Sequence, residues 1–502
     1  MRAKITIEFD KPVARINPSI YGHFAEHIGT CVYEGLWVGP ESPIPNRNGL
    51  RVDVIDALKK IHPPVLRWPG GCFADDYHWQ DGIGPREARP RRLNAHWDAE
   101  ESNEFGTHEF FELCSQLKCE PYICGNLGSG TVKEMRDWLE YMNSERDTSL
   151  TRLRAENGSP DPFGVLYFGI GNENWGCGGN LTPSFYAQEV RRYATFASLA
   201  GGNFLFKIAC GANSDDYDWT REFFNVMAGS AIHYNRLNLV NGFALHYYCG
   251  TAGTATEYTK DQWYQLFAQA LRMEQIVLTH RQVMDHFDPH RQMWLVVDEW
   301  GTWHPPMTGT NPRWVKQQNT IRDALVAALT LDIFNRHADI VFMANIAQIA
   351  NVLQSMVLTD GPQMLLTPTY HVYEMYSPHQ GAQALKMQVE TKAVPYAPTL
   401  GTTALPPVPH VAGSCSRKGA TITLSLVNTH ATDATEVELI WHGEGNLTPT
   451  TWRVLATPDI HSCNMFEQPE NAIPQDQDVG SIGDVFTLAP ASVNVIQYAL
   501  QN

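Results

Sequence analysis

The sequence predicts an α/β fold in which eight parallel strands close into a (β/α)8 barrel, or TIM barrel, with a C-terminal β-sandwich domain beside it. Two observations support this prediction. Up to residue 376, an apolar strand-like run followed by a helical segment recurs eight times, which is typical of parallel strands joined by helices. After residue 376 the helical periodicity ends, and short strands of alternating polarity follow. We therefore expect one large and one small domain.

The predicted barrel strands are apolar runs that finish in polar or aromatic residues. They occupy residues 18–27, 64–70, 120–127, 165–174, 206–213, 240–248, 293–300 and 340–348. A helix is predicted over residues 50–61, where Leu50, Val54 and Leu58 recur at helical spacing. Further helices are predicted over residues 107–117, 131–143, 183–199, 262–286 and 319–336.

The small domain is predicted from strands at both ends of the chain. Residues 421–428, 434–441 and 492–500 alternate in polarity as half-buried strands do. The N-terminal run KITIEF alternates in the same way, so it either pairs into this domain or caps the barrel independently. We expect the barrel over residues 16–378, and a β-sandwich that combines residues 1–15 with residues 379–502.

Composition and charge restrict the function. Of the 502 residues, 43% are hydrophobic and 18% are charged, which is ordinary for a compact globular protein. The formal net charge of −17 argues against nucleic acid and anionic membranes as partners, because both call for clustered Lys and Arg. A neutral substrate fits better. The N-terminus has no apolar signal core and no apolar run is long enough to span a bilayer, so we expect a cytoplasmic protein.

Two strands that each end on a glutamate suggest a catalytic pair. The run VLYFGIGNENWGCGGN sets Glu173 at the end of the fourth strand, and MWLVVDEWGTW sets Glu299 at the end of the seventh. Glycosidic bond cleavage needs two carboxyl groups, one to protonate the leaving oxygen and one to attack or stabilise the sugar cation. In a barrel of this type, reacting groups gather at the C-terminal strand ends.

Other strand ends carry polar residues as well. They are Glu26, His27, Arg67, Asn126, Asn172, His246, Tyr248 and Gln348. Each one alone has a structural explanation, such as an ordinary ion pair or a satisfied core histidine, but their joint appearance at strand ends favours a site. Six tryptophans also fall on or just after strand ends, where an indole can stack on a sugar: Trp68, Trp79, Trp97, Trp175, Trp300 and Trp303. We expect roughly half of them only to pack under loops.

Six motifs, in order, give the chain a specific resemblance. LRWPGGCFADDYHWQDGIGP, FGTHEFFELC, GNLGSGT, FGIGNENWGCGG, LHYY and DEWGTW resemble glycoside hydrolase family 51, the α-L-arabinofuranosidases. The similarity runs from about Tyr21 through Tyr376 and resumes in SVNVIQ near the C-terminus. The resemblance implies a barrel with a jelly-roll-type β-sandwich, a retaining mechanism, no metal or other cofactor, and often a hexamer. It also implies that terminal arabinofuranosyl groups are released from arabinan- or arabinoxylan-derived oligosaccharides.

The same resemblance assigns roles to individual residues. It implies that Glu173 is the general acid/base and Glu299 the nucleophile, a distinction that the residues alone leave open. It places a shell around the furanose and the two glutamates, formed by Glu26, Arg67, Asn126, Asn172, His246, Tyr248 and Gln348. Trp97 and Trp303 match aromatic positions around the sugar.

One position departs from the family pattern. Better-known members have Asn after the Gly pair, whereas this chain has Cys72. A side-chain amide that could contact the sugar is therefore missing at this position. The choice among related substrates does not follow from the family pattern. A same-fold enzyme with β-xylosidase or endoglucanase activity, or a non-catalytic sugar-binding protein, therefore remains an alternative. A dinucleotide fold, a serine hydrolase and a zinc enzyme lack the glycine spacing, GxSxG and HExxH that they require.

Cys72 and Cys177 form a possible disulfide. Both follow strand ends beside paired glycines, and both border the expected pocket. Strands two apart lie about 10 Å from each other, so both loops must lean over the barrel before a bridge can form. A bridge would hold Glu173 in place, but the expected cytoplasmic location favours two free thiols. Both alternatives stay open.

Overall fold

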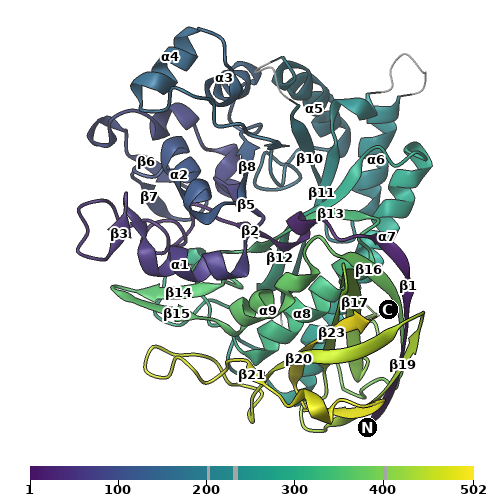
Figure 1. Ribbon diagram of the computed structural model, residues 1–502. Helices are drawn as coiled ribbons and strands as arrows, with labels where there is room; N and C mark the ends of the chain where they lie inside the picture. The colour runs from purple at the N-terminus through teal and green to yellow at the C-terminus, as the bar shows by residue number, and fades with distance from the viewer. Residues whose placement is uncertain (200–203, 230–235, 251, 400–403, 502) are drawn as a thin grey trace.

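The computed structural model describes residues 1–199, 204–229, 236–250, 252–399 and 404–501 (Figure 1). Eight parallel strands close into a barrel in the order β10, β11, β12, β13, β2, β5, β8, β9. The strands are β2 (Gly22–Phe24), β5 (Val65–Trp68), β8 (Glu120–Gly125), β9 (Tyr167–Ile170), β10 (Phe206–Asn213), β11 (Gly242–Gly250), β12 (Trp294–Trp303) and β13 (Val341–Ala347). The predicted eight-stranded barrel is confirmed.

The first strand is shorter than predicted. Pro18–Tyr21 forms a turn of 3-10 helix, in which Asn17 accepts a hydrogen bond from the backbone N–H of Ser19. Proline suits the first position of a helix because its missing N–H would have no partner there. Strand β2 therefore begins only at Gly22, and Glu26 follows its end.

Helices surround the barrel and connect its strands. They are α1 (Val52–Ile61), α2 (Thr107–Leu117), α3 (Val132–Asn143), α4 (Ser149–Glu156), α5 (Pro183–Ala197), α6 (Tyr217–Ala228), α7 (Lys260–Phe287), α8 (Ile321–Arg336) and α9 (Pro368–Tyr376). The six predicted helices are all present. Threonine N-caps start many of them; Thr259, for example, forms a capping box with Gln262 at the start of α7. No helix in the described ranges has the length and apolarity needed to cross a membrane.

The barrel interior is closed at one end by a separate apolar cluster. Its buried members are Val65, Tyr122, Tyr167, Phe206, Ile208, Ala244, Val296 and Met343. Each lies near the start or middle of its strand, so these side chains fill the N-terminal half of the barrel. The polar strand ends are left at the opposite mouth, where enzymes of this fold place their sites.

The small domain is a nine-stranded sheet in the order β21, β20, β23, β18, β17, β16, β1, β19, β22. Its strands are β1 (Arg2–Arg15), β16 (Gln383–Thr391), β17 (Val411–Lys418), β18 (Thr421–Asn428), β19 (Thr435–His442), β20 (Asn446–Ala456), β21 (Gln475–Asp476), β22 (Val485–Leu488) and β23 (Ser492–Gln501). The N-terminal strand β1 pairs antiparallel with β16 and parallel with β19.

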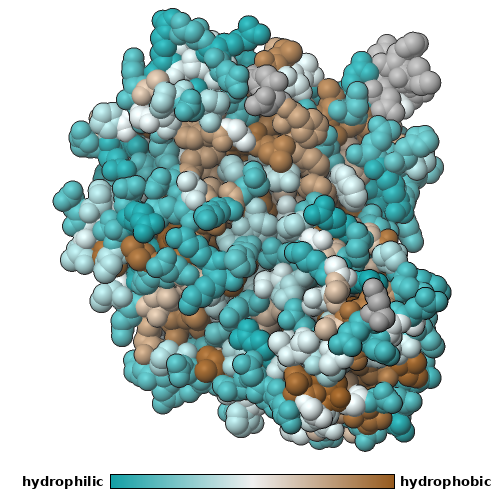
Figure 2. All heavy atoms as spheres, viewed as in Figure 1, coloured by the Kyte–Doolittle hydropathy of each residue, from teal (hydrophilic) through white to brown (hydrophobic). Residues whose placement is uncertain are grey.

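The sheet folds over its own core. Trp452 of β20 lies against Phe486 of β22, with ring centroids 5.8 Å apart, although the two strands belong to opposite ends of the sheet. The face of the molecule in Figure 2 is largely hydrophilic, with apolar residues gathered over part of the barrel and over the sheet domain.

Candidate active site

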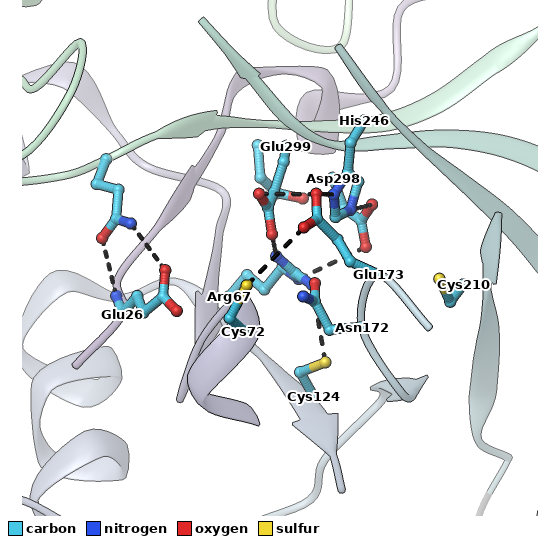
Figure 3. Close-up of polar contacts among 12 residues, drawn as sticks. Glu26, Arg67, Cys72, Cys124, Asn172, Glu173, Cys210, His246, Asp298 and Glu299 are labelled. Atoms are coloured by element: carbon cyan, nitrogen blue, oxygen red, sulfur yellow. Dashed lines mark hydrogen bonds and ion pairs between the residues drawn. The ribbon is translucent and has the colours of Figure 1, made fainter. Parts of the chain in front are cut away.

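The predicted catalytic pair meets at the C-terminal mouth of the barrel (Figure 3). Glu173 follows β9, and Glu299 lies on β12. His246, on β11, lies between them: its Nδ1 is 2.8 Å from Oε1 of Glu173 and 3.5 Å from Oε2 of Glu299. One carboxylate oxygen from each glutamate and one nitrogen of His246 all lie within 4.8 Å of one another. The two carboxyl groups are therefore close enough to act on one bond.

Glu299 is buried and surrounded by donors. Arg67 Nη1 donates to its Oε1 at 2.8 Å, and Tyr248 donates to its Oε2 at 2.9 Å. Burial raises the pKa of Glu299, while the charges of His246 and Arg67 act to lower it. These donors orient the carboxylate and favour its ionised form, which a nucleophile requires.

His246 is held as a cation. Its Nε2 donates to Asp298 at 3.1 Å, and Asp298 also accepts from Tyr122 at 2.8 Å. Burial alone would lower the pKa of His246, but Glu299 and the other carboxylates outweigh it and raise the pKa to about 10. The imidazolium therefore lies between the side chains of Glu173 and Glu299 at neutral pH.

Glu173 occupies an unusual backbone position. Its φ of 40° lies in the left-handed region, which is uncommon for a residue with a side chain. On either side of it, the backbone N–H of Asn172 and the side-chain amide of Asn174 both donate to Oδ2 of Asp75, at 2.8 and 3.0 Å. A Cβ at Gly178 would come within 2.4 Å of that oxygen, so only glycine fits there.

Asp75 joins two strand ends. Its second oxygen, Oδ1, accepts from the backbone N–H groups of Leu127 and Gly128 at 2.7 and 2.8 Å, so one carboxylate receives four hydrogen bonds from the loops after β8 and β9. Burial raises the pKa of Asp75 to about 6, although its hydrogen bonds act to lower it. The sequence alone does not identify Asp75 or Asp298 as site residues, because their contacts are with distant parts of the chain. The only local signal is that Asp298 directly precedes Glu299.

The predicted sugar-binding residues form two hydrogen-bonded groups beside the pair. Glu26 accepts from Trp97 Nε1 at 2.9 Å and Gln348 Nε2 at 3.1 Å. Burial, followed by the charge of Glu299, raises the pKa of Glu26 to about 7. Asn172 accepts from Arg67 at 2.6 Å, while its buried amide nitrogen has no partner among the described residues. That N–H is available to a substrate hydroxyl.

Asn126 is engaged differently from the others. Its amide oxygen accepts from the N–H groups of Ser129 and Gly130, and its nitrogen donates to Tyr77 and Ser129. These bonds fix the loop after β8 and use the side chain's polar atoms locally. A direct contact of Asn126 with sugar stays a prediction.

The six tryptophans divide into two groups. Trp68, Trp79 and Trp300 are buried in the core. Trp97 and Trp175 are half-buried, and Trp303 is 38% exposed and meets the ring of Tyr248 edge to face at 5.1 Å. Trp303 can therefore contact a ligand above Glu299.

His27, another residue predicted at a strand end, is buried against Glu101 and Trp68 and serves packing.

The Cys72–Cys177 disulfide is present in the structure. The two Cα atoms lie 5.5 Å apart, so both loops lean over the barrel mouth. The sulfur atoms of Cys72 and Cys177 lie 3.9 and 3.5 Å from Oε2 of Glu173. The bridge therefore forms one wall of the site beside Glu173.

Comparisons with known proteins point to one family. Residues 57–200 match the family description "Alpha-L-arabinofuranosidase 1 domain", and residues 298–492 match "Alpha-L-arabinofuranosidase C-terminal domain". The chain is 43% identical to an intracellular exo-alpha-L-arabinofuranosidase of Bacteroides ovatus, over 94% of this chain and 90% of the relative.

Solved structures agree with the sequence matches. The GH51 arabinofuranosidase from Xanthomonas axonopodis pv. citri covers 100% of both chains, with 40% identity and a TM-score of 0.93. The alpha-L-arabinofuranosidase of Thermotoga maritima, solved as an arabinose complex, covers 99% of both chains with 28% identity and a TM-score of 0.86.

Proposed function

The chain belongs to glycoside hydrolase family 51, the α-L-arabinofuranosidases, and on that premise we propose that it releases terminal α-L-arabinofuranosyl groups with net retention of configuration. We assign the nucleophile to Glu299 and the general acid/base to Glu173. One observation supports retention: oxygens of the two carboxyl groups lie within 4.8 Å of each other at the barrel mouth. Retaining glycosidases hold their carboxyl groups about 5–5.5 Å apart, whereas inverting enzymes leave about 6.5–9.5 Å for a water molecule. The division of roles between Glu173 and Glu299 follows the family resemblance.

In the first step, Glu299 attacks the anomeric carbon while Glu173 protonates the departing glycosidic oxygen. Arg67 and Tyr248 hold the attacking carboxylate in one orientation, which reduces the entropic cost of reaching the transition state. The amide nitrogen of Asn172 has no partner among the described residues, and we assign it to the 2-hydroxyl, where a hydrogen bond strengthens as the oxocarbenium-like transition state forms.

In the second step, Glu173 accepts a proton from water, and the water attacks the arabinosyl ester. Formation of the ester removes the negative charge of Glu299. Nδ1 of His246, which lies near both side chains in the free enzyme, is then paired with Glu173 alone. Glu173 then acts as the general base that takes the proton of the attacking water.

The role assignment is tested with two variants. Glu299→Ala is expected to abolish turnover of aryl arabinofuranosides, because no covalent intermediate forms. Glu173→Ala is expected to keep the first step for activated aryl leaving groups, and added azide is expected to restore turnover with a product of retained configuration. An azide adduct of inverted configuration from Glu173→Ala would exchange the two roles.

Substrate range, assembly and location extend this proposal. The relative's name describes an intracellular exo-acting enzyme, which supports short arabinan- and arabinoxylan-derived oligosaccharides as substrates and a cytoplasmic location for this chain. We infer a hexamer, to be checked by light scattering, and a domain division in which residues 1–15 join residues 379–502, as the pairing of β1 suggests. Parallel assays on p-nitrophenyl β-xyloside and cello-oligosaccharides test the xylosidase and glucanase alternatives.

A further inference from the structure

We propose that reduction of the Cys72–Cys177 disulfide creates a binding site for a thiophilic divalent cation such as Zn²⁺, formed by the two sulfurs and Oε2 of Glu173, and that the bound cation switches the enzyme off. The metal site itself is independent of the proposed function; only its inhibitory effect rests on Glu173 being the acid/base.

The positions of the three ligand atoms already match a tetrahedral zinc site. Zinc binds sulfur at about 2.3 Å and carboxylate oxygen at about 2.0 Å, so tetrahedral angles place sulfur and oxygen about 3.5 Å apart. The sulfurs of Cys177 and Cys72 lie 3.5 and 3.9 Å from Oε2 of Glu173. All three ligand atoms lie within 4.8 Å of one another. Two edges of the tetrahedron are therefore in place.

Only the separation of the sulfurs has to change. Two thiolates on one zinc ion lie about 3.8 Å apart, by the same geometry, whereas in the disulfide the two atoms are bonded. Rotation about each Cα–Cβ bond moves the sulfurs apart without moving the backbone, whose Cα atoms are 5.5 Å apart. Both cysteines are half-buried, so a small reductant and a metal ion have access to them.

The rest of Glu173 is already supported as a metal ligand needs to be. His246 holds Oε1 at 2.8 Å and is itself anchored by Asp298 (Figure 3), while Oε2 is the oxygen of Glu173 that lies near both sulfurs. Such outer hydrogen bonds orient the ligands of metal sites. A water molecule would supply the fourth ligand of a tetrahedral site.

Local charge also favours a cation. Two positive groups face the site, Arg67 and His246. Against them stand four carboxyl groups within the same hydrogen-bonded network: Asp75, Glu173, Asp298 and Glu299. Two thiolates would add two further negative charges, so a divalent cation is better accommodated than the thiolates alone.

The chemistry balances with a dithiol as reductant. Thiol–disulfide exchange transfers two electrons and two protons to the protein, which gives two cysteine thiols, and the dithiol becomes a cyclic disulfide. Binding of Zn²⁺ then releases the two thiol protons to solvent. The bound ion occupies the oxygen of Glu173 from which the leaving group would be protonated, so the first catalytic step is blocked. In the oxidised protein neither Cys72 nor Cys177 can form a thiolate, so this site is absent.

The test compares both redox states of the full-length protein. Thiol titration first verifies that the bridge is intact or reduced, and p-nitrophenyl arabinofuranoside hydrolysis is then followed against added Zn²⁺. We expect the reduced enzyme to lose activity with one equivalent of Zn²⁺ and to recover with a chelator, and the oxidised enzyme to be unaffected over the same range.

Variants identify the ligands. For each protein, inhibition is measured against its own activity without zinc. The Zn²⁺ concentration for half-inhibition should be at least about tenfold higher for reduced Cys177→Ser than for the reduced wild type. Even the loss of an outer-shell partner lowers metal affinity by about that factor. Cys463→Ser removes a half-buried thiol of the C-terminal region and should behave as wild type. Substitution with Co²⁺ gives a readout besides activity: a thiolate-to-cobalt charge-transfer band that appears only after reduction.

Two results would overturn the proposal. If Zn²⁺ inhibited both redox states equally, the ion would be bound by Glu173, His246 and Glu299 instead. If Cys177→Ser kept full sensitivity and the cobalt band, the cysteines would not be ligands. A wild-type protein without arabinofuranosidase activity would refute the proposed function, while the cobalt spectrum would still report on the metal site.

Discussion

Replacing Asp75 by Asn changes one oxygen of the carboxylate that supports the Glu173 loop. An amide keeps a single acceptor oxygen, so it can satisfy either the backbone of Leu127 and Gly128 or the groups that flank Glu173, but not both pairs. Two donors then face an NH2 group. A buried donor without a partner costs about 1–3 kcal/mol, so we expect Asp75→Asn to lower the free energy of unfolding by about 2–6 kcal/mol.

Activity should fall in a way that depends on the leaving group. The left-handed backbone at Glu173 is held from both sides by Asp75, so loss of these bonds lets the carboxyl group move. A displacement of 1 Å in a catalytic group can cost about 100-fold in rate. We expect a loss of about that size for arabino-oligosaccharides, whose leaving group needs protonation, and a much smaller loss for activated aryl arabinofuranosides.

A matched control separates positioning from general damage. Asp332 is also fully buried, but its partners are the hydroxyls of Ser414, Ser425 and Tyr376, which can rotate to suit an amide. Urea unfolding and kcat across a series of aryl leaving groups should be measured for Asp75→Asn and Asp332→Asn. If Asp75→Asn lowered kcat by the same factor for every leaving group, or cost no more stability than Asp332→Asn, the reasoning would be refuted.

Three further predictions concern single groups. Tyr248→Phe removes one of the donors to Glu299, and a lost hydrogen bond to a charged group costs about 1.5–3 kcal/mol; kcat should fall about 10- to 100-fold with little change in stability, and an unchanged kcat would contradict this. Trp303→Ala should raise KM for oligosaccharides more than for aryl arabinofuranosides, because this exposed ring lies at the rim; equal changes would remove Trp303 from the aglycone side. Burial raises the pKa of Asp332 to about 6, so protonation of this carboxyl favours the folded state. The protonated group contributes about 2–3 kcal/mol to the free energy of unfolding. This contribution is fully present below pH ~4 and is lost as the pH rises through about 6. Asp332→Asn should flatten the urea stability profile over that range, and an unchanged profile would exclude Asp332 as its source.

Much of the fold follows from local pattern in the sequence. Apolar runs that end in polar residues identified the barrel strands, and the alternating run at residues 421–428 coincides with β18. In each strand the apolar run fills the barrel interior, and the polar residues at the barrel mouth directly follow it in the sequence. The pattern can therefore be recognised from neighbouring residues alone. Glu173 and Glu299 were predicted for the same reason.

The rest depends on contacts between distant parts of the chain. Asp75 binds groups 52 to 99 residues away, and no local signal distinguishes it from its neighbour Asp76. The separation of buried Trp300 from exposed Trp303 likewise depends on which loop covers each ring. The approach of Cys72 and Cys177 required both loops to lean inward, which spacing alone could not decide.

Trapping the covalent intermediate identifies the nucleophile. An activated 2-fluoro arabinofuranoside slows hydrolysis of the glycosyl-enzyme, and peptide mass spectrometry then locates the sugar. We predict a single adduct on Glu299, with the same adduct accumulating in Glu173→Ala because its hydrolysis lacks a base. An adduct on Glu173, or an inverted product formed without any adduct, would contradict the assignment of Glu299 as nucleophile.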